Sequence, residues 1–164
     1  MAAMVVAISA SAQVYVGGTM GLGSAKVGDG DSKMSYKFVP ELGYQLDENW
    51  DLGISIGYQG VEDGNHTFEV APYGRYNFTG DKLVNFFLEG GFGFAHVGGN
   101  GADYDKYSIG IKPGVKVTLS KHVSFISKIG FLGYQQYGEG SAKVKQFGLN
   151  LNATNVQFGI NYKF

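Results

Sequence analysis

The sequence predicts an all-β protein in which eight antiparallel strands form an up-and-down barrel, and three observations support this fold class. Large apolar residues alternate with small or polar ones over long stretches, which is the pattern of strands with two different faces. Long polar connections alternate with short turns, as in a series of hairpins. No run approaches the roughly 18 apolar residues that a membrane helix needs.

The eight strands are expected over residues 13–22, 34–46, 50–59, 67–78, 84–95, 106–119 and 122–134, and from about residue 146 to 164. The apolar face of the first four comprises Val14, Val16, Met20 and Leu22; Met34, Tyr36, Phe38, Pro40, Leu42 and Tyr44; Trp50, Leu52, Ile54, Ile56 and Tyr58; and Phe68, Val70, Pro72, Tyr76 and Phe78. That of the next three comprises Val84, Phe86, Leu88, Phe92 and Phe94; Tyr107, Ile109, Ile111, Pro113, Val115 and Val117; and Val123, Phe125, Ile129 and Phe131. The last strand ends on Val156, Phe158, Ile160, Tyr162 and Phe164.

Three features interrupt the regular alternation. Leu132 breaks it in the seventh strand, and the apolar parity changes between Leu151 and Val156, so we expect a bulge or turn at residues 152–155. Proline lacks the N–H that a strand ladder uses. We therefore expect local bulges at Pro40, Pro72 and Pro113.

The volume of the side chains decides which face points inward. About forty large apolar groups cannot fit inside an eight-stranded barrel, whose interior is filled by far fewer side chains. The other face is mostly Gly, Ser, Ala, Asn and Gln, which suits a narrow lumen. The apolar face is therefore expected to contact lipid, which makes this a transmembrane barrel. Aromatic residues near both strand ends would form two girdles: Tyr36, Tyr44, Trp50, Tyr58, Tyr76 and Tyr107.

A set of charged residues falls on the inward face and is predicted to form a lumen charge network. Its members are Lys37, Glu41, Glu69, Arg75, Glu89, Lys112, Lys116 and Lys128. Five of them, Glu41, Arg75, Glu89, Lys112 and Lys128, are expected at similar heights. One interpretation is an ion or proton pathway. The favoured one is a plug of opposite charges paired across the lumen, because eight strands leave no continuous water channel.

The remaining composition excludes several kinds of protein. The chain has no Cys and a net charge of −1 with scattered Lys and Arg, so it offers no thiolate site and no basic surface for nucleic acid. Residues 1–12 have a short apolar core followed by Ala10-Ser11-Ala12, and we interpret them as the remnant of a signal peptide, with the barrel domain over residues 13–164. The alternative is that residues 1–12 form a short apolar strand of the mature protein.

No catalytic, cofactor or metal site is predicted. His122 and Ser124 have the His-x-Ser spacing of outer-membrane lipid A deacylases, but they fall at a short turn on the wrong side of the membrane for lipid A. A palmitoyltransferase would need room for an acyl chain in the lumen, and the predicted charges occupy that space. Asp29, Asp31, Asp103 and Asp105 lie in expected outer loops without EF-hand spacing, so we interpret them as solvated carboxylates.

Several segments together resemble a known family. They are Phe38-Val-Pro-Glu-Leu-Gly-Tyr44, Trp50-Asp-Leu-Gly-Ile-Ser-Ile-Gly-Tyr58, Ile111-Lys-Pro-Gly-Val115 and Phe158-Gly-Ile-Asn-Tyr-Lys-Phe164. The chain is similar to the small outer-membrane β-barrels of the OmpX, OmpA-transmembrane and opacity-protein group, and most of all to the porin-family barrels of Bacteroidota. The resemblance implies a Gram-negative outer membrane, both termini in the periplasm, and a C-terminal insertion signal at Phe158, Ile160, Tyr162 and Phe164 that the barrel-assembly machinery reads.

These features suggest three hypotheses for the function. The first is a non-enzymatic structural and interaction protein that uses its outer loops, and the second, as the alternative, is a small pore or transporter component. The third is an accessory subunit of an envelope complex that uses its lipid-facing wall. Gly90 and Gly133, both expected on that wall, would let a partner approach closely.

Overall fold

The computed structural model describes residues 13–26, 32–62, 64–80, 82–99, 101–138, 143–151 and 156–164. It contains ten strand segments. They are β1 (Val14–Lys26), β2 (Ser32–Gln45), β3 (Trp50–Val61), β4 (His66–Asn77), β5 (Val84–Gly99), β6 (Ala102–Thr118), β7 (Val123–Ile129), β8 (Phe131–Tyr137), β9 (Val144–Asn150) and β10 (Val156–Lys163). The described residues contain no helix long and apolar enough to cross a membrane.

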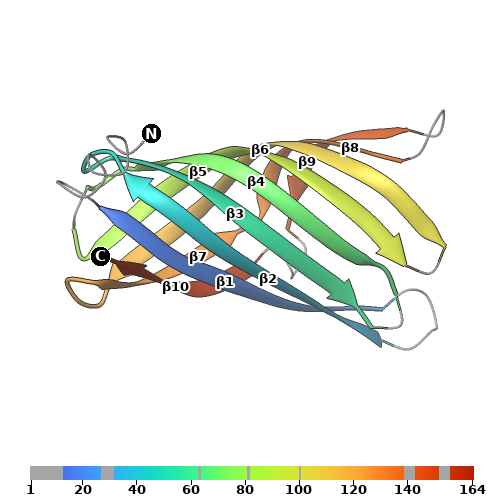
Figure 1. Cartoon of the computed structure of the whole chain (residues 1–164), viewed down its shortest axis with the longest axis horizontal. Coiled ribbons are helices and arrows are strands. Elements are labelled where there is room, and N and C mark those ends of the chain that lie inside the picture. The colour runs from blue at the N-terminus through green and yellow to red at the C-terminus, as the bar shows by residue number, and fades with distance from the viewer. Residues whose placement is uncertain are drawn as a thin grey trace, which may run out of the picture.

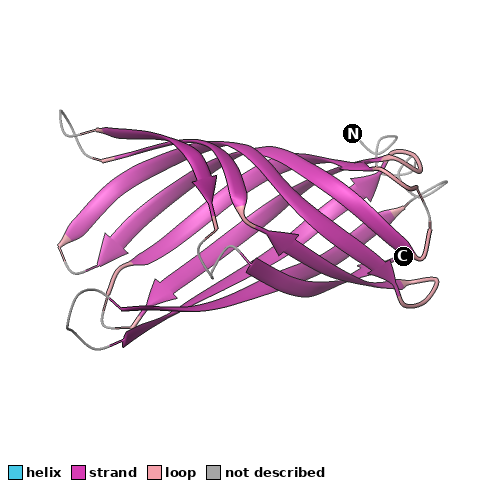
Figure 2. Ribbon diagram, turned by 180° about the vertical axis from the view of Figure 1, so that it is seen from behind, coloured by secondary structure: helices cyan, strands magenta, loops and turns pink. Residues whose placement is uncertain are grey.

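The ten segments make eight antiparallel barrel strands, as the sequence predicts, because β7 and β8 share one strand and β9 and β10 share another. β6 pairs with β7 over one half of its length and with β8 over the other half. The ladders run in sequence order from β1 to β6, and β10 closes the barrel by pairing with both β1 and β7. The strands wind steeply around an elongated barrel, seen from opposite sides in Figures 1 and 2.

The two ends of the barrel differ. Tyr15 pairs with Lys163, so the start of β1 and the end of β10 lie together at the end with the short turns. The β8–β9 hairpin extends at the opposite end, which we call the outer end (Figure 1). There β9 pairs only with β8, and β1 pairs beyond Met20 only with β2, among the strands that the structure describes. In the described part of the chain, no ladder therefore joins β9 to the outer part of β1, and we call this stretch of the wall the seam.

The apolar face points outward, as predicted. Phe38, Leu52 and Ile54 are 51%, 49% and 42% exposed, whereas Arg75 on the inner face is 1% exposed. This arrangement, the reverse of a soluble protein's, follows from volume, because the narrow lumen has room for few large side chains. The outer wall is consequently an apolar surface that needs lipid around it.

A β-bulge separates β7 from β8 and corrects one prediction. Gly114 pairs with Lys128 and Ile111 pairs with Leu132, so three residues of the β7–β8 strand oppose two residues of β6. Gly130 lies in this bulge with φ of 73°, in the left-handed region that glycine tolerates best. The extra residue reverses which of the alternating side chains point into the lumen along the rest of this strand.

Phe131 therefore points inward and is 7% exposed, and the prediction that it lies on the outer face is wrong. The same reversal places Gly133 at the lumen, beside a pocket that it lines with Phe131 and Gln135. It therefore cannot serve as a small residue on the outer wall. Gly90 does lie on the outer side, next to Ile111.

The prolines are accommodated without bulges in two of three cases. The register of β2 against β3 is the same on both sides of Pro40, and so is that of β4 against β5 around Pro72. The expectation of bulges there is wrong, because each proline is skipped by the ladder on one side and keeps its place in the ladder on the other side. Pro113 lies opposite the bulge at Gly130. The predicted irregularity at residues 152–155 lies outside the described residues.

Candidate functional site in the barrel lumen

The inner face carries a compact charge cluster in the half of the lumen nearer the short-turn end. Arg75 on β4 lies between two carboxylates, with its Nη2 2.7 Å from Glu89 Oε2 and 3.0 Å from Glu41 Oε1. Lys128 on β7 reaches the same two residues, with Nζ 2.7 Å from Glu41 Oε2 and 2.9 Å from Glu89 Oε2. Two cations and two carboxylates from four strands thus alternate across the lumen. We call Glu41, Arg75, Glu89 and Lys128 the central cluster.

The strand register explains why Arg75 lies beside Glu89, but not why Lys128 reaches the same carboxylates. Arg75 is paired with Glu89 on β5 and with Asp51 on β3, so these side chains share the inward face side by side. Asp51 Oδ2 lies 3.8 Å from Arg75 Nη1. Lys128 comes from the other side of the barrel, so its contacts with Glu41 and Glu89 bridge the lumen rather than follow a ladder.

The cluster is almost completely buried, which makes its pairing essential. Arg75, Lys128, Glu41 and Glu89 are 1%, 3%, 4% and 4% exposed. An isolated buried charge is very costly, whereas a paired and hydrogen-bonded one is tolerated. The Asn161 amide adds a hydrogen bond to Glu41 Oε1 at 2.7 Å. The cluster therefore fills the lumen with groups that satisfy one another.

Aromatic rings surround the guanidinium group. The Arg75 Cζ atom lies 4.7 Å from the Phe87 ring centroid, 5.1 Å from that of Tyr73 and 5.7 Å from that of Tyr15. The Tyr15 and Tyr73 hydroxyl groups are hydrogen-bonded to each other at 2.9 Å. Cation–π contacts of this kind gain strength when the cation is desolvated. The rings also complete the packing around the cluster.

Each of these rings occupies space next to a glycine on the neighbouring strand. Tyr15 is paired with Gly43, Tyr73 with Gly53, and Phe87 with Gly114. A Cβ atom at any of the three glycines would collide with the paired ring. Glycine is thus required here because a narrow lumen has no room for both a large ring and a second side chain.

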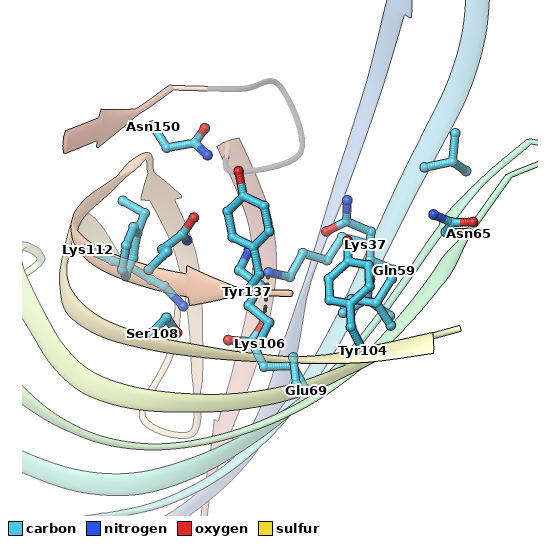
Figure 3. Close-up of a pocket in the computed structure, with 16 residues that line it drawn as sticks. Lys37, Gln59, Asn65, Glu69, Tyr104, Lys106, Ser108, Lys112, Tyr137 and Asn150 are labelled. Carbon is cyan, nitrogen blue, oxygen red and sulfur yellow. Dashed lines mark hydrogen bonds and ion pairs between the residues drawn. The ribbon is translucent and has the colours of Figure 1, made fainter. Parts of the chain in front are cut away.

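The other predicted lumen charges form separate groups. Lys37 Nζ lies 3.4 Å from Glu69 Oε2, nearer the outer end. Lys37, Glu69 and Lys112 all line one cavity on the outer side of the central cluster, which we call the outer cavity (Figure 3). Lys116 lies toward the short-turn end, in a pocket that Asp51 also lines. Of the five residues expected at one height, the structure brings four together and leaves Lys112 outside.

Sequence reasoning missed several members of the central site. Asp51, Asn161, Tyr15, Tyr73 and Phe87 all contact or surround the central cluster. One signal was available for the rings. They are large aromatic residues on a face that is otherwise small and polar, so each needed an internal partner. Asp51 carried the same signal as the other inward charges, because parity places its carboxylate on the inner face, and it was overlooked. Asn161 gave no comparable signal, because uncharged polar residues are common on that face.

The predicted surface features have clear positions in the fold. Phe158, Ile160, Tyr162 and Phe164 are all exposed along the outer face of the last strand. Trp50 and Tyr76 pack edge to face with centroids 5.0 Å apart, and Tyr36 and Tyr58 lie 6.2 Å apart. Tyr107 packs against Phe94 at 5.3 Å. Whether these rings form membrane girdles stays a prediction.

The histidines are engaged in local contacts. His122 stacks on Tyr162, and its Nδ1 atom lies 2.8 Å from the Lys163 carbonyl oxygen. His96 lies beside two exposed carboxylates, with Nδ1 3.0 Å from Asp105 Oδ1 and Nε2 3.5 Å from Asp103 Oδ1. Asp29 and Asp31 lie outside the described residues. Among the residues that the structure describes, the rings of His96 and His122 thus contact carboxylates, a carbonyl oxygen and an aromatic ring.

A family model described as the outer membrane protein beta-barrel domain matches residues 1–164. The chain belongs to this family. Family membership places the barrel in the bacterial outer membrane, with its apolar wall in lipid. No sequence among curated proteins matches the chain.

Solved structures with the same fold have very different sequences. The chain is similar to the N-terminal β-barrel domain of Pseudomonas aeruginosa OprF, with a TM-score of 0.60, 11% identity, and coverage of 93% of this chain and 98% of that chain. It is also similar to Neisserial surface protein A, with a TM-score of 0.58, 16% identity, and coverage of 92% and 97%. Pseudomonas aeruginosa OprG gives a TM-score of 0.54 at 13% identity, with coverage of 93% and 96%. At such identities the likeness shows the fold alone.

Proposed function

We propose that this chain is a non-enzymatic outer-membrane barrel with a plugged lumen. It acts as a structural and interaction protein through its outer loops or its wall. One form of this role is that of an accessory subunit of an envelope complex. The observation that carries the proposal is the central cluster, whose four charged side chains meet from four strands and are each less than 5% exposed.

The plug argues against transport along the barrel axis. Opening it would separate Arg75 and Lys128 from their carboxylates in a narrow, desolvated lumen, which would leave buried charges without partners at a high cost in free energy. The aromatic rings of Tyr15, Tyr73 and Phe87 occupy the space beside the charges. A closed lumen leaves the outer wall and the outer end as the surfaces available for function.

Conductance separates this proposal from the small-pore alternative. The purified chain is reconstituted into planar bilayers, and current is recorded against a detergent-only control. A plugged barrel gives no stepwise, voltage-proportional current. Reproducible single-channel steps would show that the cluster opens, and would favour the pore alternative.

The accessory-subunit role predicts a stoichiometric partner. The test is extraction from native membranes in mild detergent, followed by measurement of the mass of the particle that contains the chain. A defined complex supports the role. A lone species with the mass of a single chain plus detergent contradicts it and would direct attention to the outer loops.

The proposed topology has both termini in the periplasm, residues 1–12 as a signal remnant, and the last strand as the signal read by the barrel-assembly machinery. The short-turn end supports this topology, because outer-membrane barrels keep short turns on the periplasmic side. Because the chain has no Cys, single cysteines placed in the turn at Glu48 and at Gly64 report sidedness unambiguously. Labelling of Glu48→Cys by an impermeant reagent on intact cells would contradict it.

A further inference from the structure

A second site lies between the central cluster and the outer end of the barrel. It is a cavity of about 300 Å³, and its charged lining residues are Lys37, Glu69, Lys106 and Lys112 (Figure 3). Phe131, turned inward by the bulge, lines it as well. The central cluster neither uses nor fills this cavity.

The cavity carries an excess of positive charge. Lys37 Nζ lies 3.4 Å from Glu69 Oε2, so this carboxylate is the ion-pair partner of Lys37. Lys106 and Lys112 are the other two cations of the lining. Neither ammonium group makes a hydrogen bond or an ion pair with any residue that the structure describes. Lys112 is the cross-strand neighbour of Glu89, but the Glu89 carboxylate bonds Arg75 and Lys128 instead. Three cations against one carboxylate give the cavity a formal charge of +2.

Neutral donors complete the lining. Tyr104 and Tyr137, whose ring centroids lie 6.4 Å apart, line the cavity together with Ser108 and Gln135. Hydroxyl and amide groups hydrogen-bond phosphate oxygens, and charge-assisted bonds from lysine are the stronger kind. The lining therefore offers both charge and hydrogen bonds to a doubly charged anion.

We propose that this outer cavity binds a phosphate group, with Lys106 and Lys112 as its principal cationic contacts. A phosphate monoester dianion matches the formal charge of the site. The inference does not depend on whether the central cluster is a permanent plug, because the cavity lies outside it.

The proposed ligand has two sources, each with its own route to the cavity. A soluble phosphate compound enters from the outer end. A lipid-borne phosphate would enter through the seam, where no ladder between β9 and the outer part of β1 is described, since Asn150 on β9 lines the cavity. An unpaired strand edge is rarely stable against hydrocarbon, which makes the seam a natural place for a polar headgroup.

The test uses the full chain purified in an uncharged detergent, with isotope labelling to follow its backbone amides by NMR. It is titrated separately with inorganic phosphate and with short-chain phosphatidic acid. We expect saturable shifts at Lys106, Ser108 and Lys112. Shifts with both probes identify a soluble phosphate site, and shifts with phosphatidic acid alone identify the lipid route.

Matched variants make the test specific. Lys106→Gln and Lys112→Gln should each weaken binding about tenfold, which corresponds to about 1.4 kcal/mol. Lys112→Arg should retain binding because it keeps the charge. Lys145→Gln removes an exposed lysine of β9 and should leave binding unchanged. Correct folding of each variant is checked by its heat-dependent mobility in detergent gels.

Two results would overturn the proposal. One is the absence of saturable binding of either probe by the folded wild-type chain. The other is equal weakening by Lys112→Gln and Lys145→Gln, which would show a general response to surface charge rather than a site.

Discussion

Replacing Arg75 with methionine tests whether the central cluster stabilises the barrel. The substitution keeps an apolar stem of similar length but removes the cation that lies 2.7 Å from Glu89 and 3.0 Å from Glu41. Lys128 alone must then balance two buried carboxylates, with Asp51 nearby as a third. The three aromatic rings also lose the cation they surround.

The expected loss is about 3–5 kcal/mol of unfolding free energy, because one partner of a buried ion pair is removed and the other stays buried. The assay is denaturant unfolding in lipid vesicles, followed by the fluorescence of Trp50, the single tryptophan. Lys145→Met, at an exposed position, serves as the control and should change stability by less than about 0.5 kcal/mol.

A double variant separates pairing from packing. Arg75→Met with Glu89→Gln removes one charge of each sign, so Lys128 again has a single strong partner in Glu41. The double variant should lose less stability than the two single losses added together, with a coupling energy of about 1–3 kcal/mol. If Arg75→Met costs under about 1 kcal/mol, or if the two losses simply add, the central cluster does not stabilise the barrel as a unit.

Three further predictions concern the wall and its glycines. Gly114→Ala should destabilise the barrel by about 1–3 kcal/mol, since its Cβ would overlap the Phe87 ring, while Gly148→Ala, where no atom lies within 4 Å, should be nearly neutral in the same assay. Gly130→Ala should cost about 1–2 kcal/mol because φ is 73° at the bulge, and an equal stability to wild type would mean that the bulge is absent. Trp50, 47% exposed on the outer wall, should be quenched by brominated lipid chains and not by an aqueous quencher, and the reverse would contradict its placement in the bilayer.

Much of this fold could be predicted because the relevant signal is local. Alternation with a period of two depends only on neighbouring residues, so residues such as Leu52 and Ile54 could be assigned to the wall. Side-chain volume then decided that this wall faces outward. The inward charges could be assigned from the same parity, which is why Arg75 and Glu89 were identified before their contacts were visible.

Tertiary structure alone decided which of these side chains meet. Lys128 reaches Glu41 across the lumen because the stagger and tilt of all the strands together bring the two side chains to the same height. That combined geometry cannot be predicted from any short stretch of sequence. Phe131 turns inward because one added residue at Gly130 reverses the parity of the rest of the strand, and the alternation by itself placed it on the wrong face. The phosphate cavity has the same origin, since Lys37, Lys106 and Lys112 come from two strands and share a space only after the barrel has closed around it.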